Sequence, residues 1–495
     1  MCARTSRGTA GERLTSRAQS NLAGVPLFSL QDFERDALDT LAAFGAIPAL
    51  SPMFDADWQK HGYLEEAAQL LASWAKERSL ADVNVEIHRL EGRTPTLVVT
   101  VDSTAGEGDT VVLYGHLDKQ PPLGDWSEGL DPFVPVRRGD RLFARGVSDD
   151  GYAIFSALCA IETMEQHGIA HGRCVVLIEA SEESGSPDLE AYLDALAAHL
   201  GNVELLICLD SGALTYDRLW VTTSLRGLVN VEVTVQVLEQ GQHSGSVSGI
   251  VPSSFRVLRQ LLDRVEDPAT GKILVKEMWS DIPAVDAKSA HDIAQEFGDV
   301  IARELPMVQG VALMGANAEE RLLRRTWYPT LSVIGMGGLP SPDIAGNVLR
   351  PFTTAVLSFR LPPSVNASVA GAAVERILKI DPPSNAKVNV KIDSSGDGWV
   401  APELASWLAP ALEKASLEAF GRSVGFTGEG GSIPFLAALA KRYPGVQFVA
   451  TGVGGPQSNA HAIDEMLDLP MAVGVTNAVI TVLEAHANKE GPTHD

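Results

Sequence analysis

Three apolar, strand-like segments of the sequence each lead directly into acidic residues or histidine. The segments and the polar residues that follow them are 110–114 before His116 and Asp118, 174–178 before Glu182 and Glu183, and 205–209 before Asp210. Buried parallel strands are typically continuous runs of Val, Ile and Leu, and open α/β sheets bind ligands beyond the carboxyl ends of such strands. The pattern therefore predicts one crevice that collects an imidazole and four carboxylates. Bound metal ions are the usual reason that such a concentration of negative charge is tolerated.

The chain is too long for one ordinary hydrophobic core, and its pattern changes twice. Up to residue 217, strand-like runs alternate with helical periodicity at 30–44, 63–74, 152–166 and 189–200. This order predicts an α/β fold, a mostly parallel sheet with flanking helices. Residues 228–238 then alternate between apolar and polar, as in an antiparallel strand with one exposed face. The α/β pattern returns near residue 401. We therefore predict a metal-binding domain of residues 25–223 and 401–495, with an inserted α+β domain at 224–400.

Charge and cysteine usage limit the partners and the compartment. The chain has 39 Lys and Arg against 63 Asp and Glu, a formal net charge of -24, which argues against nucleic acid and anionic membrane as partners. Residues 1–24 carry four arginines without an apolar core, so they predict a disordered tail and no secretory signal. Three of the four cysteines lie in apolar runs and are expected to be buried thiols. A cytoplasmic location is the expectation.

The spacing of the acidic residues suggests individual roles. His116 and Asp118 are two apart at a strand end and would point to the same side, so we interpret His116 as a metal ligand and Asp118 as the group that orients it. An isolated H-x-D is more often a turn with an incidental histidine, but its position after a buried strand reverses that preference. Glu182 and Glu183 can point the same way only if their strand has ended, and the Ser-Gly-Ser-Pro run at 184–187 favours such an ending.

The sequence also resembles a known family in six ordered motifs. They are GHLDKQP at 115–121, RGVSDDG at 145–151, EESGS at 182–186, QHSG at 242–245, EGGSIP at 429–434 and SNAH at 458–461. Together they resemble the M20 family of dinuclear zinc metallopeptidases, over about residues 30–486. The long insertion and the Gly-Gly-Ser-Ile-Pro run are most similar to the cytosolic dipeptidase and carnosinase branch.

The resemblance implies a pair of Zn²⁺ ions in each subunit, with Mn²⁺ or Co²⁺ as possible substitutes. Asp149 would bridge them. One ion would also take His116 and Asp210, and the other Glu183 and His461. Two Zn²⁺ against three carboxylates leave one positive charge, which a bridging hydroxide would neutralise. Imidazole and carboxylate ligands without thiolate suit such ions.

The resemblance further implies catalytic and substrate-binding residues. Glu182 would be the general base that takes a proton from the metal-bridging water. His243, in the inserted lid and dimerisation domain, would reach the partner subunit's site and stabilise the oxyanion, which requires a homodimer; the alternative is an ordinary surface histidine. The implied substrate-binding positions are Asn347, Arg360, Gly431 and Ser432. An arginine suits a terminal carboxylate, although an arginine in a strand is often a structural ion-pair partner.

These expectations define the function. The chain should hydrolyse an amide bond, as a dipeptidase or carboxypeptidase on short peptides. The alternative is an N-acyl amino acid hydrolase with the same two metals. A non-catalytic relative is disfavoured, because the five expected ligands and the expected base are all present. Lys119 departs from many relatives, which have a small or apolar residue there; it could contact substrate or balance Asp125 and Glu128.

Overall fold

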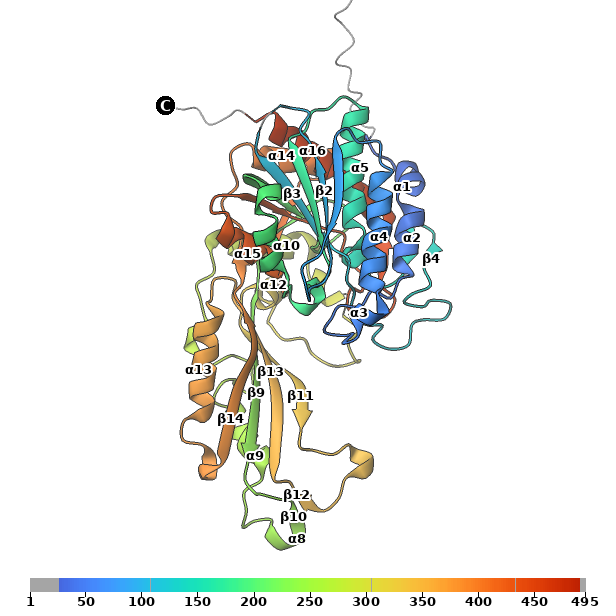
Figure 1. Ribbon diagram of the computed structural model, residues 1–495. Helices are drawn as coiled ribbons and strands as arrows, with labels where there is room; N and C mark the ends of the chain where they lie inside the picture. Colours follow the sequence, from blue (N-terminus) through green and yellow to red (C-terminus); the bar gives the residue numbers. More distant parts are fainter. Residues whose placement is uncertain (1–25, 107, 304, 432, 490–495) are drawn as a thin grey trace, which may run out of the picture.

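The computed structural model describes residues 26–106, 108–303, 305–431 and 433–489. The expected tail at 1–24 and the expected substrate-binding residue Ser432 lie outside these ranges. The described chain forms a larger body around one wide sheet and a smaller, elongated body around a second sheet (Figure 1).

The larger body is built on a nine-stranded sheet in the order β1-β2-β6-β3-β7-β17-β8-β15, with β16 paired to β8. Its strands are β1 (Val83–His88), β2 (Thr96–Val101), β3 (Thr110–His116), β6 (Arg173–Glu179), β7 (Val203–Cys208), β8 (Trp220–Leu225), β15 (Trp399–Val400), β16 (Gly425–Glu429) and β17 (Gln447–Ala450). The three segments singled out above are neighbours: β3 pairs in parallel with β6 on one side and with β7 on the other. Their carboxyl ends therefore lie along one edge of the sheet.

The sheet is parallel at its centre and antiparallel at parts of its edges. β17 continues the parallel pairing from β7, whereas β1, β2 and β15 pair antiparallel to their neighbours. A short connection such as 89–95 joins antiparallel strands directly, while parallel neighbours need a crossover. The α/β class is confirmed. The prediction of a mostly parallel sheet did not include the antiparallel strands at the edges.

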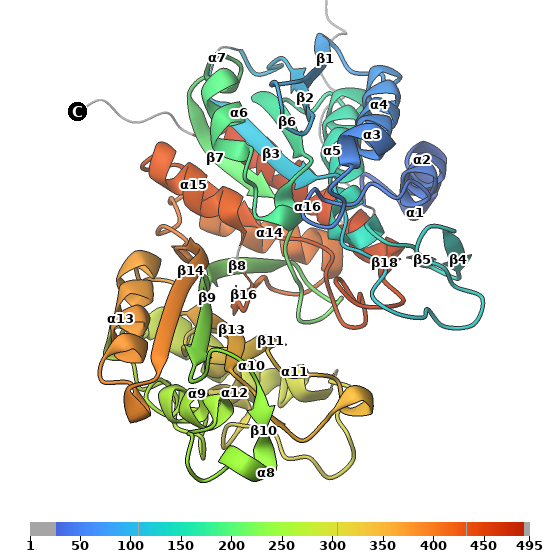
Figure 2. The same ribbon diagram turned by 60° about the horizontal axis from the view of Figure 1, so that its bottom comes forward.

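Helices cover both faces of this sheet (Figure 2). Alternate residues of β3 enter separate cores: Val111 and Leu113 pack with α5 and α16, whereas Val112 and Tyr114 pack with α6 and α15. The helices of the larger body are α1 (Leu30–Asp36), α2 (Leu38–Gly45), α3 (Trp58–His61), α4 (Tyr63–Lys76), α5 (Ala153–Gln166), α6 (Leu189–Ala195), α7 (Ala197–Leu200), α14 (Leu408–Phe420), α15 (Pro434–Arg442) and α16 (Leu469–Ala487). Burial on both faces explains why these strands are apolar without alternation.

Two of the predicted helices are interrupted. The periodicity at 30–44 divides into α1 and α2 at Ala37, whose φ of -123° is not helical, and that at 189–200 divides into α6 and α7 at Leu196. In both cases the apolar spacing continues across a bend, so periodicity alone did not reveal it.

The smaller body has a four-stranded antiparallel sheet in the order β11-β13-β9-β14. Its strands are β9 (Gly227–Gln236), β11 (Thr330–Gly337), β13 (Phe352–Leu361) and β14 (Lys387–Gly396), and its helices include α9 (Ser254–Leu262) and α13 (Ala367–Lys379). Burial alternates strictly along β9, with valines at 229, 231, 233 and 235 packed against α9 and α13. The predicted half-exposed antiparallel strand is present.

Part of the insertion packs with the larger body. The helices α10 (Ala284–Phe297) and α12 (Ala318–Thr326) contribute Ala290, Ile293 and Leu322 to the core of the nine-stranded sheet. β15 likewise pairs with β8 of that sheet. The division at residues 224 and 400 stays a prediction. By sequence α10 and α12 fall within the predicted insertion, but in the structure they pack with the larger body.

One helix in the described part of the chain is long and apolar enough to span a membrane by composition. It is α16, and 83% of its most apolar window is buried inside the molecule. This burial is typical of a central core helix.

Candidate active site

The expected site residues converge at the carboxyl edge of β3, β6 and β7. His116 is the last residue of β3 and is buried, and Asp210 lies two residues beyond β7. β6 ends at Glu179, and a 3₁₀ turn at Glu182–Ser184 follows it. The predicted end of the strand before the two glutamates is thus confirmed.

Five side chains form two groups that share one carboxylate. His116 Nε2 lies 3.2 Å from Asp149 Oδ1 and 3.8 Å from Asp210 Oδ1. His461 Nε2 lies 3.0 Å from Asp149 Oδ2 and 3.1 Å from Glu183 Oε2. Within each group the potential ligand atoms lie within 4.8 Å of one another, and Asp149 presents one oxygen to each group.

Burial and neighbouring charges shift the pKa values of the groups in this cluster. Burial raises the pKa of Asp210 well above its usual range; His116 opposes this rise, and the neighbouring carboxylates add to it. Burial and the charge of Asp210 do the same for the pKa of Glu182. Burial lowers the pKa of His461, but Asp149 and Glu183 outweigh it and raise that pKa to about 11. These shifts indicate an excess of negative charge that bound cations would neutralise. The nitrogen and oxygen donors of the cluster fit Zn²⁺, Mn²⁺ or Co²⁺.

Asp118 contacts the loop after β6 more closely than it contacts the ring of His116. Its Oδ1 and Oδ2 accept hydrogen bonds from the backbone N–H groups of Glu182 and Glu183, at 3.1 and 3.0 Å. His116 Nδ1 lies 3.0 Å from the backbone oxygen of Asp118 and 3.5 Å from its carboxylate. The carboxylate thus lies between the histidine and the two glutamates, and its role as the orienter of His116 stays a prediction.

Glu465 supports the Asp149 loop and was not expected from the sequence. Its buried carboxylate pairs with Arg145 at 2.8 Å and accepts hydrogen bonds from the backbone N–H groups of Gly146, Ser148 and Asp149 at 2.9, 3.0 and 3.2 Å. Arg145 and Ser148 belong to the motif at 145–151, but Glu465 lies outside every motif and more than 300 residues away, so no local signal could have identified it.

Gln120 is a second supporting residue, and it lies within the motif at 115–121. Its Nε2 donates to Glu183 Oε2 at 2.7 Å. The same oxygen faces His461, so Gln120 helps to set the direction of an expected metal ligand.

Lys119 is buried and forms hydrogen bonds to the backbone at the end of α2. Its side chain is fully buried, and Nζ donates to the backbone oxygens of Phe44 and Ile47, at 2.7 and 2.8 Å, where α2 ends. Burial lowers its pKa to about 7. Its partners are these carbonyls rather than Asp125 or Glu128, so the lysine fastens the end of α2 to the segment that carries His116.

Two arginines, Arg226 and Arg325, lie beside Gly430, and Arg360 is close enough to Arg226 to shift its pKa. Burial and then the nearby charges of Arg360 and Arg325 lower the pKa of Arg226 to about 10, and Arg226 also donates to the backbone oxygen of Gly430 at 3.1 Å. Arg360, half-buried on β13, has no carboxylate partner among the described residues, whereas Arg325 lies 3.8 Å from Glu429. We call Arg226, Arg325 and Arg360 the arginine cluster. Of these three arginines, the family resemblance implied only Arg360.

His243 and Asn347 lie away from this centre within one chain. His243 is exposed on β10 (Gln242–His243), which pairs with β12 (Val348–Leu349), and the backbone oxygen of Asn347 accepts a hydrogen bond from the N–H of Ser244 at 2.9 Å. Both strands sit at the end of the smaller body that is far from β3 (Figure 1). The two residues are neighbours, and the structure does not bring them to the expected metal ligands of their own chain.

Comparisons with known proteins match most of the length of the chain. The sequence model of peptidase family M20/M25/M40 matches residues 112–485. The chain is 26% identical over 408 residues to a cysteinylglycine-S-conjugate dipeptidase of Corynebacterium striatum, covering 82% of this chain and 86% of that protein.

Two solved structures have the same fold. They are the dipeptidase Dug1p of Saccharomyces cerevisiae, with a TM-score of 0.77, 22% identity and coverage of 93% and 98% of the two chains, and human carnosine dipeptidase 1, with a TM-score of 0.74, 21% identity and coverage of 92% and 97%.

Proposed function

The chain belongs to peptidase family M20/M25/M40, and from this premise we propose that it is a metal-dependent dipeptidase with a dinuclear centre. The observation that carries the proposal is the pair of ligand groups that share Asp149. His116 and Asp210 would complete one site, and Glu183 and His461 the other. Relatives named as dipeptidases support the substrate class.

The metal ions would supply Lewis-acid polarisation of the scissile carbonyl and a lowered pKa for water. Zn²⁺ is the proposed ion. Glu182 lies outside both ligand sets, on the turn held by Asp118. We assign it the proton transfer: it accepts a proton from the attacking water and delivers it to the leaving amine nitrogen.

The arginine cluster favours a substrate with a free carboxylate. Arg360 has no carboxylate partner in the described part of the chain, and Arg226 uses its side chain on backbone oxygens. A substrate's terminal carboxylate would pair with the guanidinium of Arg360, next to the backbone of Gly431. Binding of that carboxylate would limit cleavage to the bond nearest the C-terminus, as a dipeptidase or carboxypeptidase requires.

A homodimer completes the proposed site. His243 is exposed at the tip of the smaller body, so it would donate an N–H to the oxyanion in a partner subunit rather than in its own. Asn347, beside it, would approach the same substrate. The thiols of Cys159, Cys174 and Cys208 are free and buried, which supports the cytoplasm as the compartment.

A substrate panel tests the function. Metal-reconstituted protein is incubated with free dipeptides, C-terminally amidated dipeptides and N-acetylated amino acids, and the released amines are measured. Cleavage of the free dipeptides alone supports the proposal, and Arg360→Met should then raise KM for them more than it lowers kcat. Preference for the N-acetylated compounds would assign the chain to N-acyl amino acid hydrolysis instead.

A further inference from the structure

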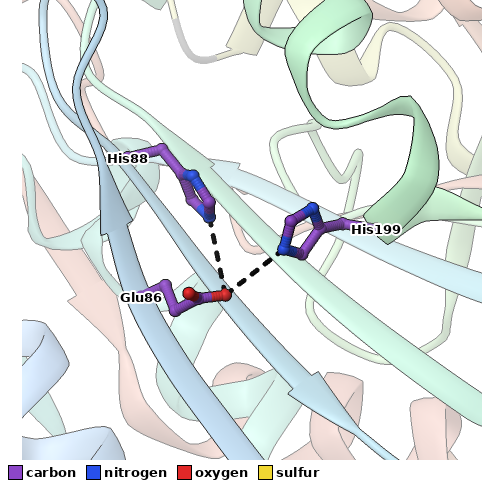
Figure 3. Close-up of side chains that lie close together, drawn as sticks. All are labelled: Glu86, His88 and His199. Carbon is purple, nitrogen blue, oxygen red and sulfur yellow. Dashed lines mark ion pairs between the residues drawn. The ribbon is translucent and has the colours of Figure 1, made fainter.

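A second group of potential metal ligands lies at the edge of the nine-stranded sheet. Glu86 and His88 are two residues apart on β1, so they project from the same face of the strand, toward His199 of α7 (Figure 3). The two histidines approach the carboxylate of Glu86 from different elements, as the close-up shows. This group shares no residue with the proposed dinuclear centre.

The three side chains lie close enough together to share a single ion: one of the two distances equals the separation expected between two ligand atoms, and the other is longer. His199 Nε2 lies 3.3 Å from Glu86 Oε2, and His88 Nε2 lies 3.8 Å from the same oxygen. Two ligand atoms bound at ~2.0–2.1 Å to a tetrahedral Zn²⁺ are ~3.3–3.4 Å apart. The two rings meet edge to face, with centroids 5.1 Å apart, so both Nε2 atoms reach the carboxylate without a clash between the rings.

The packing around His88 and Glu86 favours ligation. His88 Nε2 is a buried nitrogen without a hydrogen-bond partner among the described residues. Asn84 Nδ2 donates a hydrogen bond to Glu86 Oε2 at 2.8 Å and so fixes the orientation of the carboxylate, as supporting residues of metal sites commonly do.

We propose that Glu86, His88 and His199 bind one divalent transition-metal ion of the Zn²⁺ class, separate from the dinuclear centre. Two imidazoles and one carboxylate suit Zn²⁺, Ni²⁺, Co²⁺ or Cu²⁺, whereas Ca²⁺ and Mg²⁺ prefer oxygen ligands alone. Glu86 and His199 are 42% and 37% exposed at their side chains, so solvent water completes the coordination and the ion exchanges with the medium.

The ion has a structural role. β1 is the edge strand and pairs only with β2 in the described part of the chain, and α7 leads into β7. Three strand spacings, about 14 Å, separate β1 from β3, so the ion does not act on the substrate directly. It cross-links the edge strand β1 to α7 and stabilises the folded protein in proportion to its occupancy.

Zinc stoichiometry tests the proposal. Wild type, His199→Ala and His88→Ala are equilibrated by dialysis against buffered Zn²⁺, and zinc per chain is measured by plasma mass spectrometry. Each variant is expected to bind one ion fewer than wild type. The matched control is His291→Ala: His291 Nδ1 lies 2.9 Å from Glu319 on the surface, without a second imidazole, and its removal should leave the zinc content unchanged.

The same comparison in an Asp149→Asn background separates this site from the active site. There the dinuclear centre is impaired, yet adding His199→Ala should still remove one zinc ion and abolish the zinc-dependent rise in Tm. Circular dichroism shows whether each variant is folded, and His199→Gln replaces His199→Ala if it is not. Equal zinc in wild type and in both histidine variants, or an equal loss in His291→Ala, would overturn the proposal without bearing on the peptidase function.

Discussion

The carboxylate of Asp118 accepts a hydrogen bond from the backbone N–H of Glu182 at 3.1 Å, so the segment after β3 holds the turn after β6. A second hydrogen bond, from the N–H of Glu183, uses the other oxygen of the same carboxylate. One side chain therefore sets the position of both the proposed base and a proposed ligand.

Asp118→Ala should lower kcat by about 10- to 100-fold, because both glutamates lose the group that positions them. Asp118→Asn, which keeps one acceptor oxygen, should lose less. Steady-state kinetics with matched metal content measures the difference. If the Asn and Ala variants lost the same activity while both stayed folded, the loss could not be attributed to the pair of hydrogen bonds.

Glu182→Gln should lower kcat by about 10²- to 10⁴-fold and leave the metal content close to that of wild type, since the amide cannot accept the proton from water. Kinetics and metal analysis on the same preparation provide the test. Loss of metal together with activity would instead make Glu182 a ligand.

Arg145→Met should destabilise the protein by about 3–5 kcal/mol, because the buried carboxylate of Glu465 would lose its only charged partner in the described chain. The double variant Arg145→Met/Glu465→Gln should recover part of this loss, since no buried charge remains unpaired. Denaturant unfolding curves of the two variants decide the matter, and equal stabilities would contradict the reasoning.

Metal uptake by the metal-free protein should release protons and weaken as the pH falls. Without ions, the pKa of His461 is raised to about 11, so its imidazole is protonated at pH 7 and must lose that proton to bind a metal. The raised pKa of Asp210 acts in the same direction. Calorimetric titration with Zn²⁺ in buffers of different ionisation enthalpy measures the release, and heats that do not depend on the buffer would refute it.

His243→Ala should reduce kcat with little effect on KM, and mixing it with a Glu182→Gln protein should restore part of the activity if subunits exchange. In such a mixed dimer, one site combines an intact His243 from one chain with an intact Glu182 from the other. If the mixture were only as active as the sum of the two separate variants, the proposal that His243 acts in the partner subunit's site would be contradicted.

The sequence alone predicted the α/β class and the strand ends that carry the site. Apolar runs at β3, β6 and β7 reflect burial on both faces, and burial is a local property that the sequence records residue by residue. The identities of His116 and Asp210 follow from their place after those strands. The remaining ligands were expected through the family resemblance, because Asp149 and His461 do not follow a recognisable strand.

Only the tertiary structure revealed the groups that meet across long separations. Glu465 supports the Asp149 loop from 316 residues away, and Lys119 is buried against the end of α2 rather than exposed in the crevice. Such contacts depend on how whole elements pack, and packing leaves no periodic signal in either partner's sequence. The meeting of Glu86, His88 and His199 has the same origin. The apolar runs and the polar strand ends are local properties that can be recognised in the chain alone, whereas the packing of whole elements fixes which polar groups share a site.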